Sequence, residues 1–167
     1  MSSDAARRSQ GMGGDEFRRA CGRFATGVAI AAALDASGAP HGLTISSVAA
    51  VSLEPPLLLF SIGHGSALLP MFCAAGRFGL SILSEEQRDL SDRFARKGHD
   101  RFDGVAWRAG ASGVPLLDGA LAQIECSLYN RVTAGDHDIF IVEAVAAHFH
   151  SGEPLIHFAS RYHTLEK

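Results

Sequence analysis

The pattern of apolar and polar residues predicts a chain made mainly of short strands, with a few helices between them. Apolar runs, some of them alternating with polar residues, are separated by clusters of Gly, Asp, Ser and Pro that favour turns. The predicted strands cover residues 28–34, 57–60, 77–83, 120–132, 139–149 and 155–158. Antiparallel strands with helices between them indicate an α+β, mostly β domain, built on a closed or partly closed β-barrel.

The first helix is predicted to begin at Asp15, which is a good N-cap residue, and to end at Gly27. Apolar residues recur between them at helical spacing, while charged residues fill the other positions, as in an amphipathic helix. The preceding residues, 1–14, are polar, rich in Gly and Ser, and lack the apolar core of a secretory signal. We therefore expect a flexible tail at residues 1–14 and a single domain at residues 15–167.

Two further helices are predicted between strands. One covers residues 67–74 and follows Ser66, whose hydroxyl can cap it. The other covers residues 84–97 and begins with a Ser followed three positions later by a Gln, which is the spacing of a capping box. Residues 98–114 combine turns, charges and the sole tryptophan, so we expect a surface excursion there.

Composition narrows the class of protein. The 167 residues are 47% hydrophobic, which suits one globular domain with a core of its own. A formal net charge of −3 argues against binding to nucleic acid or to an anionic membrane. No apolar run reaches a length of about 20 residues, which a membrane-spanning helix needs. Cys21, Cys73 and Cys126 lie far apart without a CxxC spacing, so we expect buried thiols and a soluble, cytoplasmic protein.

The most informative stretch is residues 41–62, which read HGLTISSVAAVSLEPPLLLFSI. Thr44, Ser46 and Ser47 lie within four positions of the chain, and two alanines follow shortly after them. Hydroxyls beside such small side chains allow a planar or anionic group to come close to the backbone. The alternative interpretation is that these hydroxyls only satisfy backbone groups within a strand.

Other polar groups have both functional and ordinary interpretations. The bend at residues 63–66 exposes amides that suit an anion, although Ser66 can also be a plain helix cap. His137 lies in a predicted turn and is either solvated or functional. His148 and His150 share one strand face but lack a third ligand, so no metal site is expected. The absence of a GxSxG elbow argues against a Ser-His-Asp hydrolase.

Four motifs stand out when the chain is considered as a whole. They are FRRACGRFATGVAI from Phe17, GLTISS from Gly42 with Ser52 following, GDH from Gly135 leading into Ile139 and Phe140, and PLIHFASRYHTL from Pro154. Each motif is weak alone, but their order and distances make them specific together. Over about residues 17–165 the chain resembles the short-chain flavin reductases, the small components of two-component flavin-dependent monooxygenases.

The resemblance implies an FMN-binding split β-barrel, antiparallel and of Greek-key type, with peripheral helices. It also implies a homodimer with flavin near the subunit interface, which oxidises NADH or NADPH and releases reduced FMN or FAD to a separate monooxygenase. The choice within each pair of cofactors stays open. A flavin- or haem-binding protein of the same fold without reductase activity is the alternative, because a fold alone does not decide function.

Particular residues take on roles through this resemblance. Thr44, Ser46 and Ser47 correspond to positions that hold the ribityl and phosphate groups of the flavin. Ser61 corresponds to a position beside the flavin ring. His137 corresponds to a histidine near the nicotinamide and is the implied catalytic residue. The full set of implied cofactor-binding residues is Thr44, Ser46, Ser47, Ser61, Ser66, Ser81, Arg161 and Tyr162.

The sequence also departs from the family pattern. Residues 63–66 read GHGS where many members carry an Asn-Lys-Ser-Ser-like run, so the lysine that would pair with a phosphate is absent. Ser81 stands in place of a common Asn, whereas Val142 and Ser160 each stand in place of a common Gly. His64 can replace the charge of the absent lysine only in part. Arg77, Arg93, Arg96 and Lys97 are interpreted as solvated surface residues, although one of them could supply the charge for the phosphate.

Overall fold

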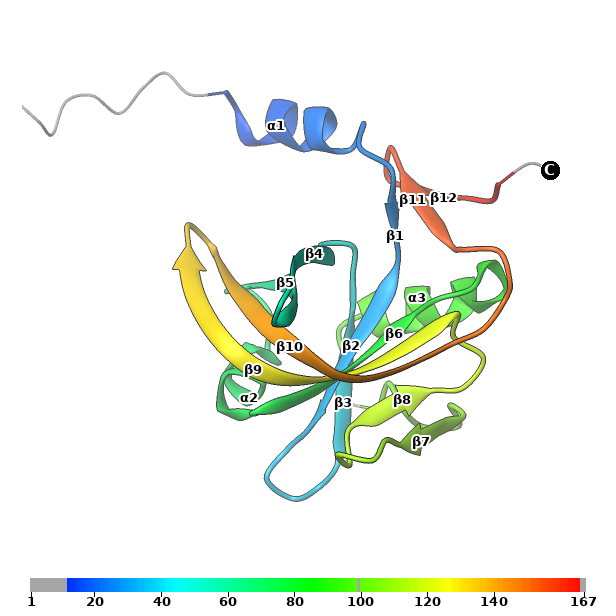
Figure 1. Cartoon of the computed structure of the whole chain (residues 1–167). Coiled ribbons are helices and arrows are strands. Elements are labelled where there is room, and N and C mark those ends of the chain that lie inside the picture. Colours follow the sequence, from blue (N-terminus) through cyan, green and yellow to red (C-terminus); the bar gives the residue numbers. More distant parts are fainter. Residues whose placement is uncertain (1–11, 99, 166–167) are drawn as a thin grey trace, which may run out of the picture.

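Among residues 12–98 and 100–165, which the computed structural model describes, the fold is organised around one strongly twisted antiparallel sheet of seven strands (Figure 1). In sheet order the strands are β3 (Pro40–Ile45), β2 (Ala29–Leu34), β6 (Arg77–Ile82), β9 (Ala122–Ala134), β10 (His137–Phe149), β5 (Pro56–Gly63) and β4 (Ala49–Leu53). The sheet coils until β3, at one edge, contacts β5, which is next to the other edge. It therefore forms a partly closed barrel, and the prediction of a mostly β, α+β domain is confirmed.

Two smaller sheets and three helices surround the main sheet in the described part of the chain. β1 (Thr26–Gly27), β11 (Ile156–Phe158) and β12 (Arg161–His163) form one small sheet, and β7 (Trp107–Ala109) pairs with β8 (Pro115–Leu117). The helices are α1 (Gly14–Cys21), α2 (Leu69–Ala74) and α3 (Arg88–Ala95), the last preceded by the 3₁₀ turn η1 (Glu85–Gln87). None of these described helices is both long and apolar enough to cross a membrane.

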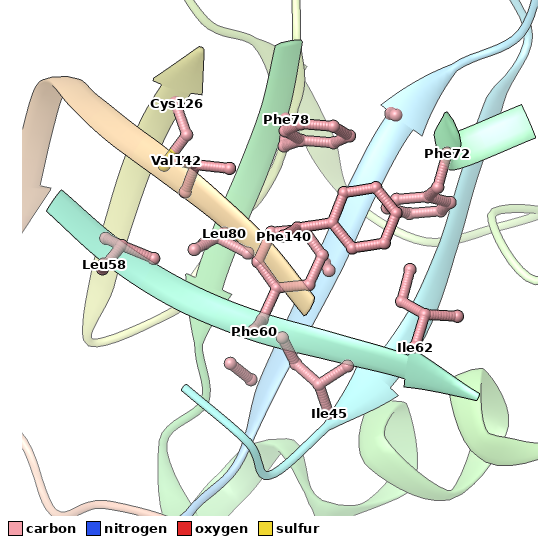
Figure 2. Packing of buried hydrophobic residues seen from close by; sticks show 13 residues of the cluster. Ile45, Leu58, Phe60, Ile62, Phe72, Phe78, Leu80, Cys126, Phe140 and Val142 are labelled. Carbon is pink, nitrogen blue, oxygen red and sulfur yellow. The ribbon is translucent and has the colours of Figure 1, made fainter. Parts of the chain in front are cut away.

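Four phenylalanine rings fill the inside of the coiled sheet (Figure 2). Phe60 of β5 stacks on Phe140 of β10 with ring centroids 5.1 Å apart. Phe72 of α2 stacks on Phe78 of β6 with centroids 5.8 Å apart. All four side chains are fully buried, and the two stacks meet edge to face, which is a favourable arrangement for aromatic rings. We call these four residues the aromatic core.

Strand β2 is buried on both faces, which explains its unbroken run of apolar residues. One face packs on the aromatic core, whereas Ile30 on the other face packs with Phe94 of α3 and with Phe102. Phe102 and Val114 are both buried. The prediction of a surface excursion at residues 98–114 is therefore wrong for the buried residues, which help to cover the outer face of the sheet, whereas much of the segment is exposed as predicted.

The N-terminal helix differs from its prediction at both ends. Gly13 is the N-cap of α1, so Asp15 lies in the first turn and does not cap the helix. The helix ends at Cys21, earlier than predicted, and none of its residues is buried. Phe17 is 61% exposed and Cys21 is exposed, so the expectation of a buried thiol is wrong at Cys21. The part of the predicted tail at residues 1–11 lies outside the described residues.

The start of η1 confirms the predicted capping box. The Ser84 amide donates a hydrogen bond to Gln87 Oε1 (3.2 Å), and the Gln87 amide donates to the Ser84 side chain. The box begins a 3₁₀ turn that continues directly into α3, and α3 ends at Ala95, slightly before the predicted end. The loop that follows Ala95 contributes to the candidate site.

Candidate functional site

The end of β3 and the residues after it carry the hydroxyl segment, Thr44 to Ser47. Thr44 Oγ1 donates a hydrogen bond to the Ser91 carbonyl of α3 (2.6 Å). Ser47 Oγ accepts one from the Ser61 amide of β5 (2.9 Å). Ser46 is exposed between them. The segment is thus tied to α3 on one side and to β5 on the other. The hydroxyls of Thr44 and Ser47 form hydrogen bonds with backbone groups, as the alternative interpretation of this segment expected.

Two pockets share Thr44 and Ala95 as a common wall. The larger, of about 530 Å³, lies between β3, the loop after β5 and the loop after α3, and we call it the cationic pocket. Its polar lining residues are His41, Thr44, Ser66, Lys97 and Arg101, and Gly65 also lines it. The smaller, of about 200 Å³, which we call the tyrosine pocket, includes Ser46, Ser91, His157 and Tyr162 in its lining. The hydroxyl segment therefore borders both pockets.

Lys97 and Arg101 place two positive charges in the cationic pocket, and no Asp or Glu of the described chain lines it. Arg101 Nη1 donates a hydrogen bond to the Gly42 carbonyl of β3 (2.7 Å). Its Nε is buried and has no hydrogen-bond partner among the described residues. Burial lowers the pKa of Arg101, because it penalises the charged form of the guanidinium. A partly buried guanidinium with an unused donor suits an anionic ligand.

Ser66 lines the cationic pocket from a turn and does not cap a helix. Helix α2 begins at Leu69 with Leu68 as its N-cap, so the predicted helix over residues 67–74 starts later than expected and the predicted cap is wrong. The Ser66 hydroxyl accepts a hydrogen bond from the Leu68 amide (3.3 Å), and the Ser66 amide donates to the Gly63 carbonyl (2.9 Å). These bonds fix the Ser66 side chain at the pocket.

The loop before Ser66 is tied to the β9–β10 hairpin. His64 Nε2 lies 3.0 Å from Asp138 Oδ1, and the Thr133 hydroxyl donates a hydrogen bond to the same oxygen (2.8 Å). Asp138 is only 6% exposed. The hydrogen bond with His64, and to a smaller extent the one from Thr133, lowers the pKa of its carboxyl. His64 is therefore engaged by a carboxylate and does not line the cationic pocket, so it does not replace the absent lysine there.

His137 is the first residue of β10, whereas it was predicted within a turn. Its Nδ1 lies 2.7 Å from Asp136 Oδ1, and its side chain is 48% exposed. The ring lies against Gly63 of β5, where an added Cβ would come within 3.3 Å of His137 Nε2. His137 lines neither pocket, but it lies beside the strand end that leads to Gly65 and Ser66.

The remaining predicted residues are in different environments. Tyr162 lines the tyrosine pocket, and its hydroxyl oxygen lies 2.8 Å from Ser91 Oγ. Arg161 is exposed and lines neither pocket. Ser81 is only 1% exposed, and its hydroxyl accepts a hydrogen bond from the Leu117 amide (3.0 Å). This geometry makes Ser81 part of the packed sheet, away from both pockets, and does not support its predicted contact with a cofactor.

Arg101 is the pocket residue that the sequence did not reveal. Of the candidate cations, Lys97 lines the cationic pocket, but Arg101 was not among them. Arg101 lies in the segment that was expected to be a surface excursion, next to the buried Phe102. A phenylalanine between charged residues was the available signal that this segment packs against the sheet.

A coiled antiparallel sheet with a hydroxyl-lined, cationic pocket beside its edge strand defines a β-rich protein suited to a phosphorylated planar ligand. The chain belongs to the flavin reductase family, because residues 21–166 match the family described as "Flavin reductase like domain". The family prediction is thus confirmed, and the chain has the split-barrel fold of flavin reductases.

Individual relatives and one solved structure give the same result. "FMN reductase (NADH) SmoA" of Agrobacterium fabrum is 42% identical over 139 residues, which are 83% of this chain and 79% of that protein. "Flavin-dependent trigonelline monooxygenase, reductase component" of Acinetobacter baylyi is 44% identical over 126 residues, 75% of this chain. The chain spans 41% of the length of this second relative. The structure of "NADH:FAD oxidoreductase SgcE6" of Streptomyces globisporus, "in complex with NAD and FAD fragments", is 32% identical with a TM-score of 0.86, covering 91% of this chain and 92% of that one.

Proposed function

We propose that this protein is an NAD(P)H:flavin oxidoreductase, which passes a hydride from NADH or NADPH to FMN or FAD and supplies the reduced flavin to a separate monooxygenase. The observation that supports this most directly is the position of the hydroxyl segment, which borders two adjoining pockets, one cationic and one containing Tyr162. Such a site can hold a phosphorylated flavin at one end and a second flat ring near it. The relative named as a reductase component supports the separate oxygenase partner.

The polar groups of the two pockets fit a flavin. A flavin phosphate is an anion, and the cationic pocket offers Lys97, Arg101 and the Ser66 hydroxyl without a lining carboxylate from the described chain. The exposed Ser46 and the exposed, small Ala49 leave the backbone accessible to a flat ring. Flavin and nicotinamide supply the hydride chemistry itself when both are bound.

The chain's own task is therefore to bind and orient two cofactors. Lys97 and Arg101 hold the phosphate end, which fixes the distance of the ring from the hydroxyl segment. Ser47, held by the Ser61 amide, keeps this segment rigid. His137, half-exposed beside the end of β5, orients the nicotinamide by hydrogen bonding. Holding both rings in a reactive arrangement is the main contribution that a protein can make to such a transfer.

The proposed enzyme is a homodimer. Large apolar side chains are exposed on α1, on β4 and on the C-terminal halves of β9 and β10. Helix α1 lies apart from the main sheet in Figure 1. Leu53, Phe149 and Phe24 are 89%, 82% and 77% exposed. Because soluble monomers rarely leave large apolar patches uncovered, a second copy of the chain is the expected cover. Sedimentation velocity should give twice the mass of one chain, and a monomer at every concentration would contradict this assignment.

Two further features complete the proposal. The free thiols of Cys21, Cys73 and Cys126 support a cytoplasmic location, where thiols stay reduced. Steady-state kinetics with NADH and NADPH, each against FMN, FAD and riboflavin, will define the preferred pair.

The experiment that tests the proposed activity mixes the purified protein with FMN and NADH under air. Loss of the NADH absorbance over many turnovers per protein molecule is expected, because oxygen reoxidises the released flavin. Altered flavin fluorescence without faster NADH consumption would instead identify a flavin-binding protein and would contradict the reductase assignment. A parallel run without protein corrects for direct reaction of NADH with FMN.

A further inference from the structure

The cationic pocket takes its charge from a different part of the chain than the family pattern suggests. The loop after β5 lacks the expected lysine, and its His64 pairs with Asp138. The pocket nevertheless contains Lys97 and Arg101, which come from the loop after α3. We propose that Arg101, assisted by Lys97, binds the phosphate group of the flavin and makes the site selective for phosphorylated flavins over riboflavin. This inference rests on the proposed function, because it names the group that recognises part of that ligand.

Arg101 is held in place before any ligand arrives. Its Nη1 donates to the Gly42 carbonyl, and Gly42 itself is buried in β3. An added Cβ at Gly42 would lie 3.0 Å from the Phe94 side chain and 3.1 Å from the Ala31 carbonyl, so the strand is closely packed at this point. The anchor is therefore rigid, and little side-chain entropy remains to be lost when Arg101 binds an anion.

The donors that Arg101 does not use support an anionic ligand. Its Nε is buried without a partner among the described residues, although a buried donor of this kind is costly to leave unsatisfied. Arg101 is also partly buried, so its charge is partly removed from water, and this burial lowers the pKa of the side chain. An oxygen anion bound by Arg101 in the pocket compensates for this lost solvation of the charge.

The rest of the lining fits a phosphate. Ser66 presents a hydroxyl held by the turn, and Lys97 adds a second, mobile cation. His41 also lines the pocket, and its Nε2 lies 2.9 Å from Asp35 Oδ2, so this nitrogen is already engaged by a carboxylate. The whole chain carries a net charge of −3, so two cations at one pocket are a local feature that general surface charge does not explain.

The experiment compares dissociation constants for FMN and riboflavin, which differ only in the phosphate. They are measured by quenching of flavin fluorescence for the full chain and for Arg101→Met, Lys97→Met and Arg96→Met. Arg96 is exposed in the same loop but does not line the pocket, so it is the matched control. We expect Arg101→Met to weaken FMN binding by about 10- to 100-fold, the value of one or two charge-assisted hydrogen bonds. Lys97→Met should weaken it by about threefold, and Arg96→Met by less than about twofold.

Riboflavin separates recognition of phosphate from a structural role of Arg101. If Arg101 binds phosphate, its replacement leaves the riboflavin dissociation constant unchanged within about twofold. If Arg101 acts only by holding Gly42, both flavins weaken equally, and the inference is overturned. Arg101→Lys, which keeps the charge, should retain part of the preference for FMN. Arg101→Lys also provides the test if Arg101→Met does not fold. In that case the inference is overturned if Arg101→Lys prefers FMN over riboflavin as strongly as wild type does and Lys97→Met binds FMN as tightly as wild type.

The wild-type protein distinguishes this inference from the proposed function. Wild type that binds FMN at least about tenfold more tightly than riboflavin supports the inference. Wild type that binds and reduces both flavins equally overturns the phosphate selectivity but leaves the reductase function in place. Wild type that binds neither flavin overturns the proposed function and, with it, the role of Arg101.

Discussion

The aromatic core and the cationic pocket adjoin each other, since Leu43 and Leu68 line the pocket and also pack against the cluster that contains the core, but the two are built in opposite ways. The core takes its rings from β5, β6, β10 and α2, and each ring is fully buried among apolar neighbours. The pocket takes its polar groups from β3 and two loops, and Arg101 Nε has no hydrogen-bond partner within the part of the chain that the structure describes. The core thus satisfies its own side chains, whereas the pocket is left incomplete without a ligand. Stability and binding should therefore respond to different substitutions.

The largest effect is expected from the core. Phe60→Ala removes a ring that stacks on Phe140 and meets Phe72 and Phe78 edge to face. The free energy of unfolding should fall by about 3–5 kcal/mol, because a large cavity replaces the ring. Urea denaturation followed by circular dichroism measures the change. Phe60→Leu, which keeps much of the volume, is the control and should cost no more than about 1.5 kcal/mol. Equal losses for both variants would contradict the packing argument.

The next effect concerns function without stability. His137→Ala removes a half-exposed ring that lines neither pocket, so folding should be unaffected. If His137 orients the nicotinamide, kcat/KM for NADH should fall by about tenfold, the value of one hydrogen bond of about 1.4 kcal/mol. The dissociation constant for FMN should not change. His148→Ala, an exposed histidine further along β10, serves as the control. If His137→Ala has the same kcat/KM for NADH as wild type, His137 does not orient the nicotinamide and has only an ordinary structural role.

A smaller gain in stability is expected at the β11–β12 turn. Ser160 has a φ of 63° and follows Ala159 with a φ of 49°, and both lie in the left-handed region that favours glycine. This explains why a glycine is common at the position of Ser160. Ser160→Gly should raise the free energy of unfolding by about 0.5–1 kcal/mol, since relief of strain exceeds the added backbone entropy. Ser151→Gly, at a position with ordinary φ, should give no gain. No difference between these two variants would be evidence against strain at Ser160.

The smallest expected effect is a change in pH dependence near the site. Hydrogen bonds from His64 and Thr133 lower the pKa of Asp138, so its carboxylate stabilises the fold at neutral pH. That contribution is lost as the pH falls below about 4, where an unfolded aspartate takes up a proton. Asp138→Asn should thus lose stability less steeply than wild type on acidification, whereas replacement of the exposed Asp118 by Asn should leave the slope unchanged. Urea midpoints at several pH values measure both, and identical slopes for wild type and Asp138→Asn would refute the link.

The same contrast explains what could be predicted from the sequence. The strands of the core follow from local patterns, because buried side chains alternate along β5 and the buried β2 reads as a continuous apolar run. The capping box at Ser84 is equally local, since both partners lie within one turn. The N-cap of α1 was predicted wrongly because the local pattern offers more than one choice. The helix can begin at the two glycines before Asp15 as well as at Asp15, and Gly13 is the N-cap in the structure.

The pocket depends on contacts between distant parts of the chain, which a local pattern does not contain. Arg101 and Gly42 are 59 positions apart, and their contact exists only because α3 packs over β2 and β3. Ser81 illustrates the opposite error, since a position shared with a family pattern lies inside the sheet in this chain. The cluster of hydroxyls and small residues identified the hydroxyl segment from the sequence, but only the fold shows that Thr44 borders both pockets.

A crystal structure of the protein with FMN tests the phosphate site most directly. We expect the flavin phosphate in the cationic pocket, in contact with Ser66 and Arg101, and the rest of the flavin extending along the hydroxyl segment past Thr44. Well-ordered FMN bound elsewhere on the protein, with the cationic pocket holding only solvent, would contradict it.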